Sequence, residues 1–225
     1  MKTPRTNSNG RGLALSETSI AAFWSWFGDC PIVDELGRPR VMYHGTKDDF
    51  DGFDLKKAGR SDPGLVGRAL YFTPSPEQAS SIAESAFYGR GEAPNVIPVY
   101  VSLQNPVTIN DGRFPDGASL HDAHPSGISS ESAARLQKKL RQAGYDGAIF
   151  VIAGEITQVV AFDPSQVKSA IGNPGTYCSA SPHLTDGHKI VVGAVVDVSD
   201  LRAAAAREAR NQVQSGVTPR ALRAR

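Results

Sequence analysis

The sequence predicts an α+β fold, and three observations carry this prediction. Short apolar runs of strand-forming residues alternate along the chain with segments of helical periodicity. The runs at 148–152 and 158–162 face each other across Ala153-Gly154-Glu155, which is typical of an antiparallel hairpin rather than of βαβ winding. The chain has 225 residues, of which 40% are hydrophobic, so it is long enough to build one core.

The first helix is predicted shortly after the N-terminus. Its apolar residues recur at helical spacing after a Ser-Glu-Thr-Ser start: Ile20, Phe23, Trp24 and Phe27. Gly28 ends this pattern. Residues 1–15 are polar and rich in Gly, Ser and Asn, so we expect them to be disordered.

Two short strands, 40–43 and 69–73, are predicted next, separated by a long loop at 47–68. The loop carries several glycines and five basic residues, and we expect it to be mobile. Pro-Ser-Pro at 74–76 then opens a helix. The residues that share one face of this helix are Ala79, Ile82, Ala83 and Ala86.

The second half of the chain continues the same alternation. Its predicted elements are strands at 96–103 and 107–109, a loop at 111–130, a helix at 133–143 that Gly144 ends, and the hairpin described above. Beyond 177, a strand at 190–198 and a helix at 201–213 are predicted. We therefore expect a domain over 16–180 and a C-terminal strand and helix extension over 181–225.

Composition limits the classes of partner and location. The net charge of +1 gives no electrostatic basis for general nucleic-acid or membrane binding. Cys30 and Cys178 fit neither a metal spacing nor a disulfide framework, so we expect a reducing, cytoplasmic location. No secretory signal is expected, although a protein delivered into a host cell or carried in a virion would have the same composition. The histidines lack metal-ligand spacing, so no metal is predicted.

Three segments carry residues suited to binding a nicotinamide nucleotide. Residues 41–46 read Val-Met-Tyr-His-Gly-Thr, residues 69–73 read Ala-Leu-Tyr-Phe-Thr, and residues 157–163 read Thr-Gln-Val-Val-Ala-Phe-Asp. An imidazole and a hydroxyl can hydrogen-bond a ribose, and a glycine lets a ligand approach backbone amides. A tyrosine ring offers a face to a flat heterocycle.

In order, spacing and flanking sequence, these segments resemble the three motifs of the ADP-ribosyltransferase superfamily, in its His-Tyr-Glu branch of diphtheria toxin and PARP enzymes. The similarity is strongest to the ADP-ribosyltransferase domain of phage polyvalent proteins, and it runs from about Phe23 to Tyr177. The resemblance implies a split β-sandwich of two small antiparallel sheets with flanking helices. It also implies that NAD, the co-substrate, binds in the cleft between the sheets.

The resemblance further implies roles for individual residues. His44 would hydrogen-bond the adenosine ribose, Gly45 would meet the nicotinamide carboxamide through its backbone, and Thr46 would fix the turn. Tyr71 would stack on the nicotinamide ring, with Thr73 as its polar neighbour. Basic residues that could face the pyrophosphate are Arg60, Arg68 and Lys168.

The chain departs from the family pattern at two positions. A second stacking tyrosine is replaced by Ile82, and the catalytic glutamate is replaced by Gln158. A glutamine amide can position ribose hydroxyls but supplies no negative charge, and loss of one such group costs about 10²–10³ in rate. Glu155 could supply the missing carboxylate, but residues an odd number apart on a strand lie on opposite faces.

These features predict a mono-ADP-ribosyltransferase that modifies a macromolecule, namely a protein, as an effector, toxin or phage-type enzyme. Two alternatives remain open at this stage. The missing carboxylate and the replacement at Ile82 also suit an NAD-binding pseudoenzyme that acts as an interaction module. The same site also serves an NAD glycohydrolase, in which water accepts the sugar.

Overall fold

The computed structural model describes residues 3–14, 16–48, 50–58, 62–85, 94–171, 173, 175 and 177–185. The chain divides into two units, 1–191 and 192–225, and all described residues belong to the first. The strand and helix predicted at 190–198 and 201–213 lie outside the described residues. Where the chain is described, no helix combines the length and apolarity that crossing a membrane requires.

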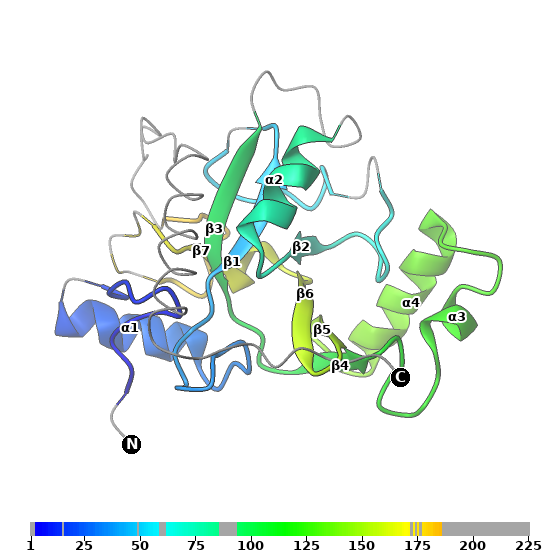
Figure 1. Cartoon of the computed structure of the whole chain (residues 1–225), viewed down its shortest axis with the longest axis horizontal. Coiled ribbons are helices and arrows are strands. Elements are labelled where there is room, and N and C mark those ends of the chain that lie inside the picture. The colour runs from blue at the N-terminus through cyan, green and yellow to red at the C-terminus, as the bar shows by residue number, and fades with distance from the viewer. Residues whose placement is uncertain are drawn as a thin grey trace, which may run out of the picture. The chain divides into compact units, whose positions relative to one another are not determined.

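The described domain contains two small sheets, which confirms the predicted α+β class (Figure 1). The three-stranded sheet has the order β1-β3-β7, with β1 at Met42–Thr46, β3 at Asn95–Val101 and β7 at Val167–Ser169. The four-stranded sheet has the order β2-β6-β5-β4. Its strands are β2 (Leu70–Phe72), β4 (Pro106–Asn110), β5 (Gly147–Ile152) and β6 (Glu155–Ala161).

The four-stranded sheet is not wholly antiparallel, contrary to the expectation from the sequence. Strands β4 and β5 pair in parallel, with Val107 opposite Ala148. The chain between them contains α3 (Leu120–Ala123) and α4 (Ser130–Gln142), so it returns to the starting edge before β5 begins. A parallel pair requires such a crossover, whereas a tight hairpin gives an antiparallel pair. The loop expected at 111–130 thus includes the short helix α3.

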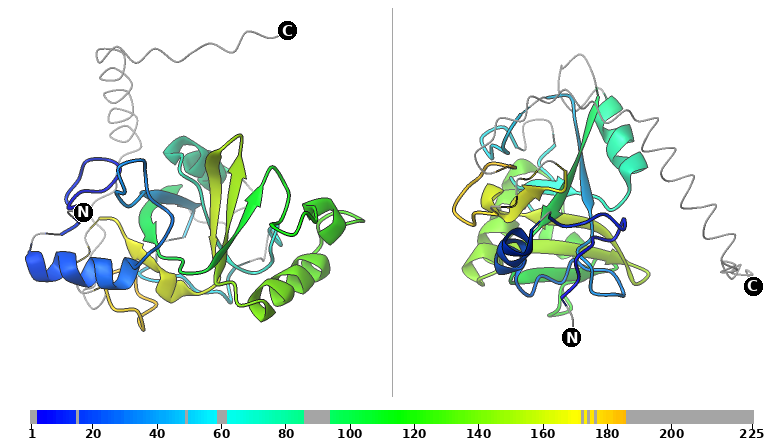
Figure 2. Two further views of the ribbon diagram at one scale, coloured as in Figure 1. Left: turned by 90° about the horizontal axis from the view of Figure 1, so that it is seen from below. Right: turned by 90° about the vertical axis from the view of Figure 1, so that its left-hand side faces the viewer.

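Helix α1 (Glu17–Phe27) begins and ends where the sequence signals predict, and α2 (Pro76–Glu84) begins where they predict. Ala86, which the pattern placed on the face of this helix, lies outside the described residues. Ser16 and Ser75 accept hydrogen bonds from backbone amides of the first turns, which satisfies donors that a helix start leaves unpaired. The N–H of Gly28, which ends α1 with φ 57°, donates to the carbonyl of Trp24. Helices α1 and α4 lie at opposite ends of the domain (Figures 1 and 2).

Two hydrophobic clusters stabilise the domain, one on each face of the four-stranded sheet. The first joins this sheet to the three-stranded sheet and α1, and its centre includes Phe23, Phe72 and Tyr100. The second lies under α4, where Leu136 and Leu140 pack with Phe150 and other residues of the sheet. Side chains alternate between the two faces of a strand, so the two clusters identify which face each residue occupies.

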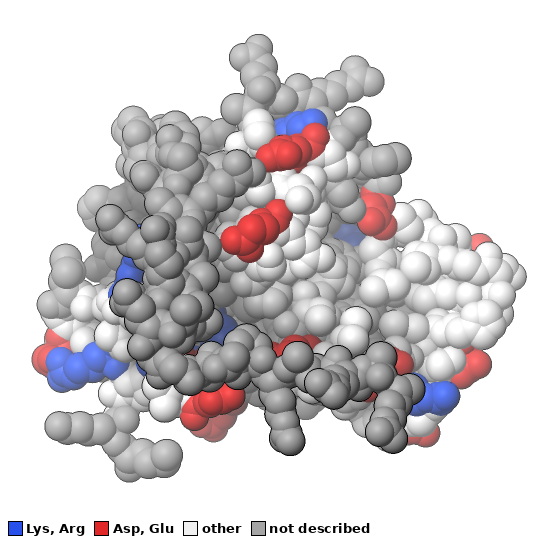
Figure 3. Space-filling view, viewed as in Figure 1, with Lys and Arg blue, Asp and Glu red and all other residues white. Residues whose placement is uncertain are grey.

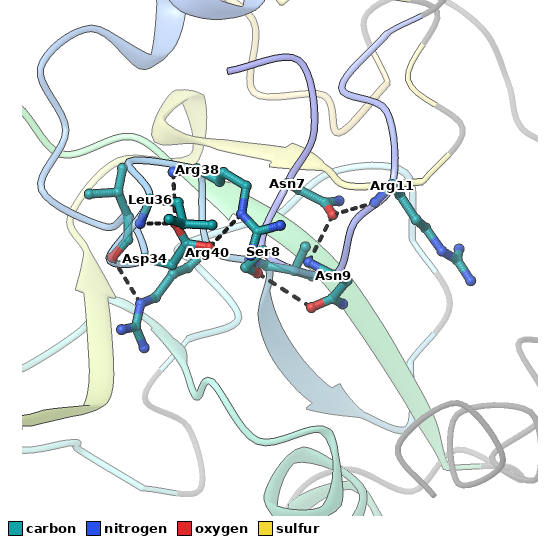
Figure 4. A network of polar contacts seen from close by, with 10 residues as sticks. Asn7, Ser8, Asn9, Arg11, Asp34, Leu36, Arg38 and Arg40 are labelled. Carbon is teal, nitrogen blue, oxygen red and sulfur yellow. Dashed lines mark hydrogen bonds and ion pairs between the residues drawn. The ribbon is translucent and has the colours of Figure 1, made fainter. Parts of the chain in front are cut away.

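Residues 3–14 are ordered by contacts with the core, so the disorder expected for 1–15 does not hold there. Asn7 is buried, its Nδ2 donates to the hydroxyl of Tyr100 at 2.8 Å, and its Oδ1 accepts from the backbone of Asn9 and Arg11. The Nδ2 of Asn9 donates to the hydroxyl of Tyr43. Figure 4 shows this turn beside the Asp34–Arg40 loop. A polar segment is ordered here because buried side chains satisfy its hydrogen bonds.

The described domain also extends past the boundary expected at 180. The N–H of Ser169 donates to the carbonyl of Leu184, and the N–H of Leu184 donates to the carbonyl of Asp51, both within 3.0 Å. Lys168 is fully buried, and its Nζ donates to the carbonyls of Ser181 and His183. Residues 181–185 are therefore bonded to the domain, and two of them, Leu184 and Thr185, are buried in it.

Candidate functional site

The two sheets meet at one bridge and diverge beyond it. Strand β2 pairs with β6 as far as Phe72 opposite Val159. At Thr73 the chain pairs with β1 instead: the N–H of Tyr43 donates to the carbonyl of Thr73 at 2.8 Å, and the N–H of Thr73 donates back at 3.0 Å. From this bridge β1 runs antiparallel to β2, and His44 and Gly45 lie beside Phe72 and Tyr71 without further backbone pairing, so a split opens between β1 and β2, while β6 lies on the other side of β2. The segments that carry the three motifs therefore converge here.

Strand β1 continues through His44, Gly45 and Thr46, instead of ending before them as the sequence suggested. Backbone groups of alternate residues on a strand point to the same side. The N–H and C=O of Tyr43 point toward β2, so those of Gly45, two residues on, point to the same side, where β2 no longer pairs. Gly45 therefore presents one donor and one acceptor to the split, which matches the needs of a primary carboxamide.

The glycine at position 45 also has a packing reason, which the sequence did not indicate. A Cβ there would lie 1.9 Å from the carbonyl oxygen of Ala79 and 3.0 Å from the backbone nitrogen of Ala83. Both atoms belong to the backbone of α2, which cannot move aside as a flexible side chain would. Glycine is needed at this position because α2 packs directly against β1.

His44 spans the split from β1 to β2. Its Nδ1 lies 2.9 Å from the carbonyl oxygen of Tyr71. A carbonyl only accepts, so Nδ1 carries the proton and Nε2 of the neutral ring is an acceptor. Burial lowers the pKa of His44 below its ordinary value of 6.5, which keeps the ring neutral. Such an Nε2 can accept a hydrogen bond from a ribose hydroxyl.

Three phenylalanines surround the ring of His44. The centroids of Phe53, Phe72 and Phe50 lie 5.0, 5.7 and 6.5 Å from that of the imidazole. Phe50 and Phe53 belong to the loop expected to be mobile and basic, and sequence reasoning missed their role. Two aromatic residues three apart in an otherwise polar loop were the available signal.

Tyr71 is half-buried and packs with the second hydrophobic cluster. Its hydroxyl donates to the carbonyl of Gly67 at 2.7 Å and accepts from the N–H of Val66 at 3.2 Å. A Cβ at Gly64 would lie 2.1 Å from the same hydroxyl oxygen. Burial raises the pKa of the Tyr71 phenol, so it stays protonated. Loop residues 64–67 thus hold this ring in a fixed position.

The same loop is held from its outer side by α3 and α4. His124, which sequence reasoning dismissed, is buried, and its Nε2 lies 2.8 Å from the carbonyl oxygen of Leu65. Its Nε2 must donate there, so its Nδ1 accepts from the hydroxyl of Ser132 at 2.8 Å. Gln137 donates to the carbonyl of Arg68 at 2.7 Å. These bonds fix the loop that positions Tyr71.

Some of the remaining residues that the sequence assigned to the site lie as expected, and others do not. Thr46 fixes the turn after β1 as expected, since its hydroxyl accepts from the N–H of Asp48 at 3.0 Å. The hydroxyl of Thr73 instead donates to the side chain of Gln78, in the first turn of α2, at 2.5 Å. Ile82 was expected on the buried face of α2, but it is only half-buried, whereas Ala79 and Ala83 are buried. The Arg68 side chain is exposed.

Lys168 does not face the split, because its Nζ is held by the carbonyls of Ser181 and His183. Arg60 lies outside the described residues. Among the residues that the structure describes, no group of three His, Cys, Asp or Glu side chains could hold a metal ion.

Gln158 is half-buried and lies on β6, one residue beyond the last β2 pair, level with Thr73 of the bridge. It shares a face of the sheet with Val160, which pairs with Tyr71. In the described part of the chain, its side-chain amide makes no hydrogen bond to the protein. Glu155 begins β6 and is exposed. The expectation that Glu155 lies on the opposite face does not hold, because the pairing of β5 and β6 contains a register shift after Phe150.

Comparison with known proteins agrees with this geometry. The family model described as ADP-ribosyltransferase in polyvalent proteins matches residues 34–177, which is more than half of the chain and includes His44, Tyr71 and Gln158. No curated protein was found to match the chain. Enzymes of this family use NAD as their substrate. The chain belongs to the family of ADP-ribosyltransferase domains found in polyvalent proteins.

Proposed function

We propose that this domain transfers one ADP-ribose unit from NAD to a macromolecular acceptor, namely a protein. One observation supports the proposal: β1, β2 and β6, which carry His44, Tyr71 and Gln158, lie side by side at the junction of the two sheets, in a chain whose family uses NAD. Family membership supports ADP-ribosylation in general. The protein acceptor and the transfer of a single unit belong to the proposal.

Each group at the split fits one part of NAD. The backbone donor and acceptor of Gly45 suit the nicotinamide carboxamide, and Nε2 of His44 suits a ribose hydroxyl. The ring of Tyr71, fixed by the 64–67 loop, offers a face to the nicotinamide ring. The amide of Gln158, which has no hydrogen bond to the described residues, suits the hydroxyls of the nicotinamide ribose. Together these groups would orient the glycosidic bond toward an acceptor.

The reaction itself is a glycosyl transfer. The bond between C1′ of the ribose and the nicotinamide nitrogen breaks, and its electron pair leaves with nicotinamide, which becomes neutral. C1′ gains oxocarbenium character, as in other glycosyl cleavages. A nucleophile of the acceptor then donates an electron pair to C1′ and loses its proton to solvent. With water in place of the acceptor, the same steps give free ADP-ribose.

The identity of Gln158 supports transfer of a single unit. The resemblance to the His-Tyr-Glu enzymes implies that members that extend ADP-ribose chains retain glutamate at this position.

Figure 3 shows acidic and basic side chains interspersed on one face of the domain. The described surface on that face therefore has no concentration of one charge sign that would select a strongly charged acceptor.

The test uses the purified chain, labelled NAD, and bacterial and eukaryotic lysates. We expect label on a discrete protein band with the parent and with His121→Ala, an exposed histidine outside the split, and no label with His44→Ala. NAD that is neither bound nor cleaved by the parent would overturn the proposal. Free ADP-ribose without labelled protein would assign hydrolysis instead.

A second function is favoured by one specific observation, the amide at Gln158 in place of a carboxylate. An NAD-binding interaction module would need the site to bind but not to react. In that case the parent would bind NAD in a thermal-shift assay and release no nicotinamide, while Gln158→Glu would release it. Turnover by the parent excludes this function.

A further inference from the structure

The hairpin of β5 and β6 contains one extra residue on β6. Phe150 pairs with Gln158, but the next β5 residue, Val151, pairs with Ile156. One step along β5 thus corresponds to two steps along β6, which leaves Thr157 as a β-bulge. The hydroxyl of Thr157 donates to the carbonyl of Phe150 at 3.3 Å, which links the bulge to the partner strand.

The bulge reverses the alternation of faces on its N-terminal side. Glu155 pairs with Ile152, and Gln158 pairs with Phe150. Ile152 and Phe150 are two residues apart on β5, which has no extra residue, so they share a face. Paired residues also share a face, so Glu155 and Gln158 lie on the same side of the sheet although they are three apart in sequence.

The hydrophobic clusters confirm this reversal independently of the pairing. Val159 belongs to the first cluster, between the sheets, whereas Phe150 and Val160 belong to the second. Ile156 also packs against the first cluster, although it is three residues from Val159. Simple alternation would have put Ile156 on the other face. The residue before it, Glu155, is therefore on the face of Gln158 and Tyr71.

The spacing is suited to a pair of side chains acting together. Counted on the regular partner strand, Glu155 and Gln158 are two residues apart, or about 7 Å along the strand. The two-residue turn between the strands is fixed, since the N–H of Ala153 donates to the carboxylate of Asp111 at 3.1 Å. The carboxylate of Asp111 therefore has a structural role in holding this turn. In the described part of the chain, the carboxylate of Glu155 has no ion pair or hydrogen bond.

We propose that Glu155 supplies the negative charge that Gln158 lacks, and that the Thr157 bulge is the feature that makes this possible. Gln158 then positions the ribose hydroxyls, and the carboxylate of Glu155 stabilises the positive charge that develops at C1′ as nicotinamide leaves. The inference rests on the proposed function, and it divides the work of one glutamate between two residues.

The test measures nicotinamide release by the parent, Glu155→Gln and a control, Glu131→Gln, which changes an exposed carboxylate on α4. We expect Glu155→Gln to lower kcat by about 10- to 100-fold, with KM within about threefold, since an effect confined to the transition state lowers kcat without changing KM. Glu131→Gln should match the parent. Gln158→Glu, added to Glu155→Gln, should restore the rate by returning a carboxylate to the site.

A second variant separates the bulge from simple alternation. Glu155→Gln combined with Ile156→Glu moves the carboxylate by one residue, to the face that simple alternation would assign to Gln158. We expect no recovery of kcat in this variant, with the melting temperature measured to account for the partly buried Ile156. Recovery by Ile156→Glu, or full activity of Glu155→Gln, would overturn the inference while leaving the proposed function intact. A parent that releases no nicotinamide overturns both.

Discussion

The two edges of the candidate site, β1 on one side of β2 and β6 on the other, differ in how they are built. On the β1 edge, Gly45 is buried against α2, and His44 is enclosed by aromatic rings and bonded to β2. On the β6 edge, Gln158 is half-buried and Glu155 is exposed at a hairpin. The groups suited to binding NAD are thus part of the core, while those suited to the chemistry lie at its margin. Substitutions on the first edge should affect folding and binding together, and substitutions on the second should affect rate alone.

The largest effect should come from Gly45→Ala, which tests how rigid the β1 edge is. The new Cβ would approach a backbone carbonyl of α2 to 1.9 Å, so the helix must shift. We expect a loss of about 3 kcal/mol in the free energy of unfolding, at the upper end of the cost of overpacking, together with loss of NAD binding. Denaturant unfolding measures the free energy of unfolding, and a thermal-shift assay with NAD measures binding.

Gly12→Ala is the matched control, because a Cβ there would meet only the carbonyl oxygen of Ala14, at 4.0 Å. This variant should stay close to the parent in stability. Equal stability of Gly45→Ala and Gly12→Ala would show that α2 is not packed against β1 as described.

The pH dependence of stability tests the neutral state of His44. Its pKa is lower in the folded protein than the ordinary 6.5, so below pH 6.5 the unfolded chain binds a proton that the folded domain does not. The contribution of His44 to the free energy of unfolding is therefore highest above pH 6.5. It falls as the pH drops toward the pKa of His44 in the folded domain, by up to about 1.4 kcal/mol per pH unit.

Urea unfolding of the parent and His44→Gln at pH 5 and pH 8 checks this expectation. The difference in stability between the two pH values should be smaller in the variant, which cannot take up the proton. The same difference in both proteins would mean that His44 is not the group responsible.

A moderate effect is expected from Tyr71→Phe, which keeps the ring but removes its bonds to the 64–67 loop. The hydroxyl bonds to Gly67 and Val66 are lost, so the free energy of unfolding should fall by about 1–2 kcal/mol. The affinity for NAD should change by less than about threefold, because the ring face remains. Isothermal titration with NAD and denaturant unfolding give both values, and a large loss of affinity without loss of stability would contradict this assignment.

The smallest effect should come from Arg68→Ala, which tests the predicted contact with the pyrophosphate. The side chain is exposed, and exposed charge pairs contribute roughly 0.2–1 kcal/mol. We expect NAD affinity to fall by no more than about fivefold, and the loss to shrink at high salt. An effect that is unchanged by salt would rule out a charge contact of this kind.

Local patterns identified much of the fold correctly. The starts of α1 and α2 follow from Ser16 and Ser75, and the hairpin of β5 and β6 follows from the turn between them. Asp163 precedes the 3-10 turn at Pro164–Gln166, and its carboxylate accepts a hydrogen bond from the N–H of Ser165. In contrast, strand β7 was missed, and Lys168, which was considered as a pyrophosphate contact, is fully buried. Its burial depends on carbonyls that lie more than ten residues away.

The sequence alone determined which residues can reach the site and which chemistry they lack. The sequence shows directly the order of His44, Tyr71 and Gln158. It also shows that position 158 is not a glutamate. The tertiary structure decided why position 45 must be glycine, why residues 3–14 are ordered, and on which face Glu155 lies. Each of these depends on a partner far along the chain. A β-bulge in particular exists only in the pairing of two strands, because it is an extra residue on one strand relative to the other. The sequence of one strand alone therefore cannot show it.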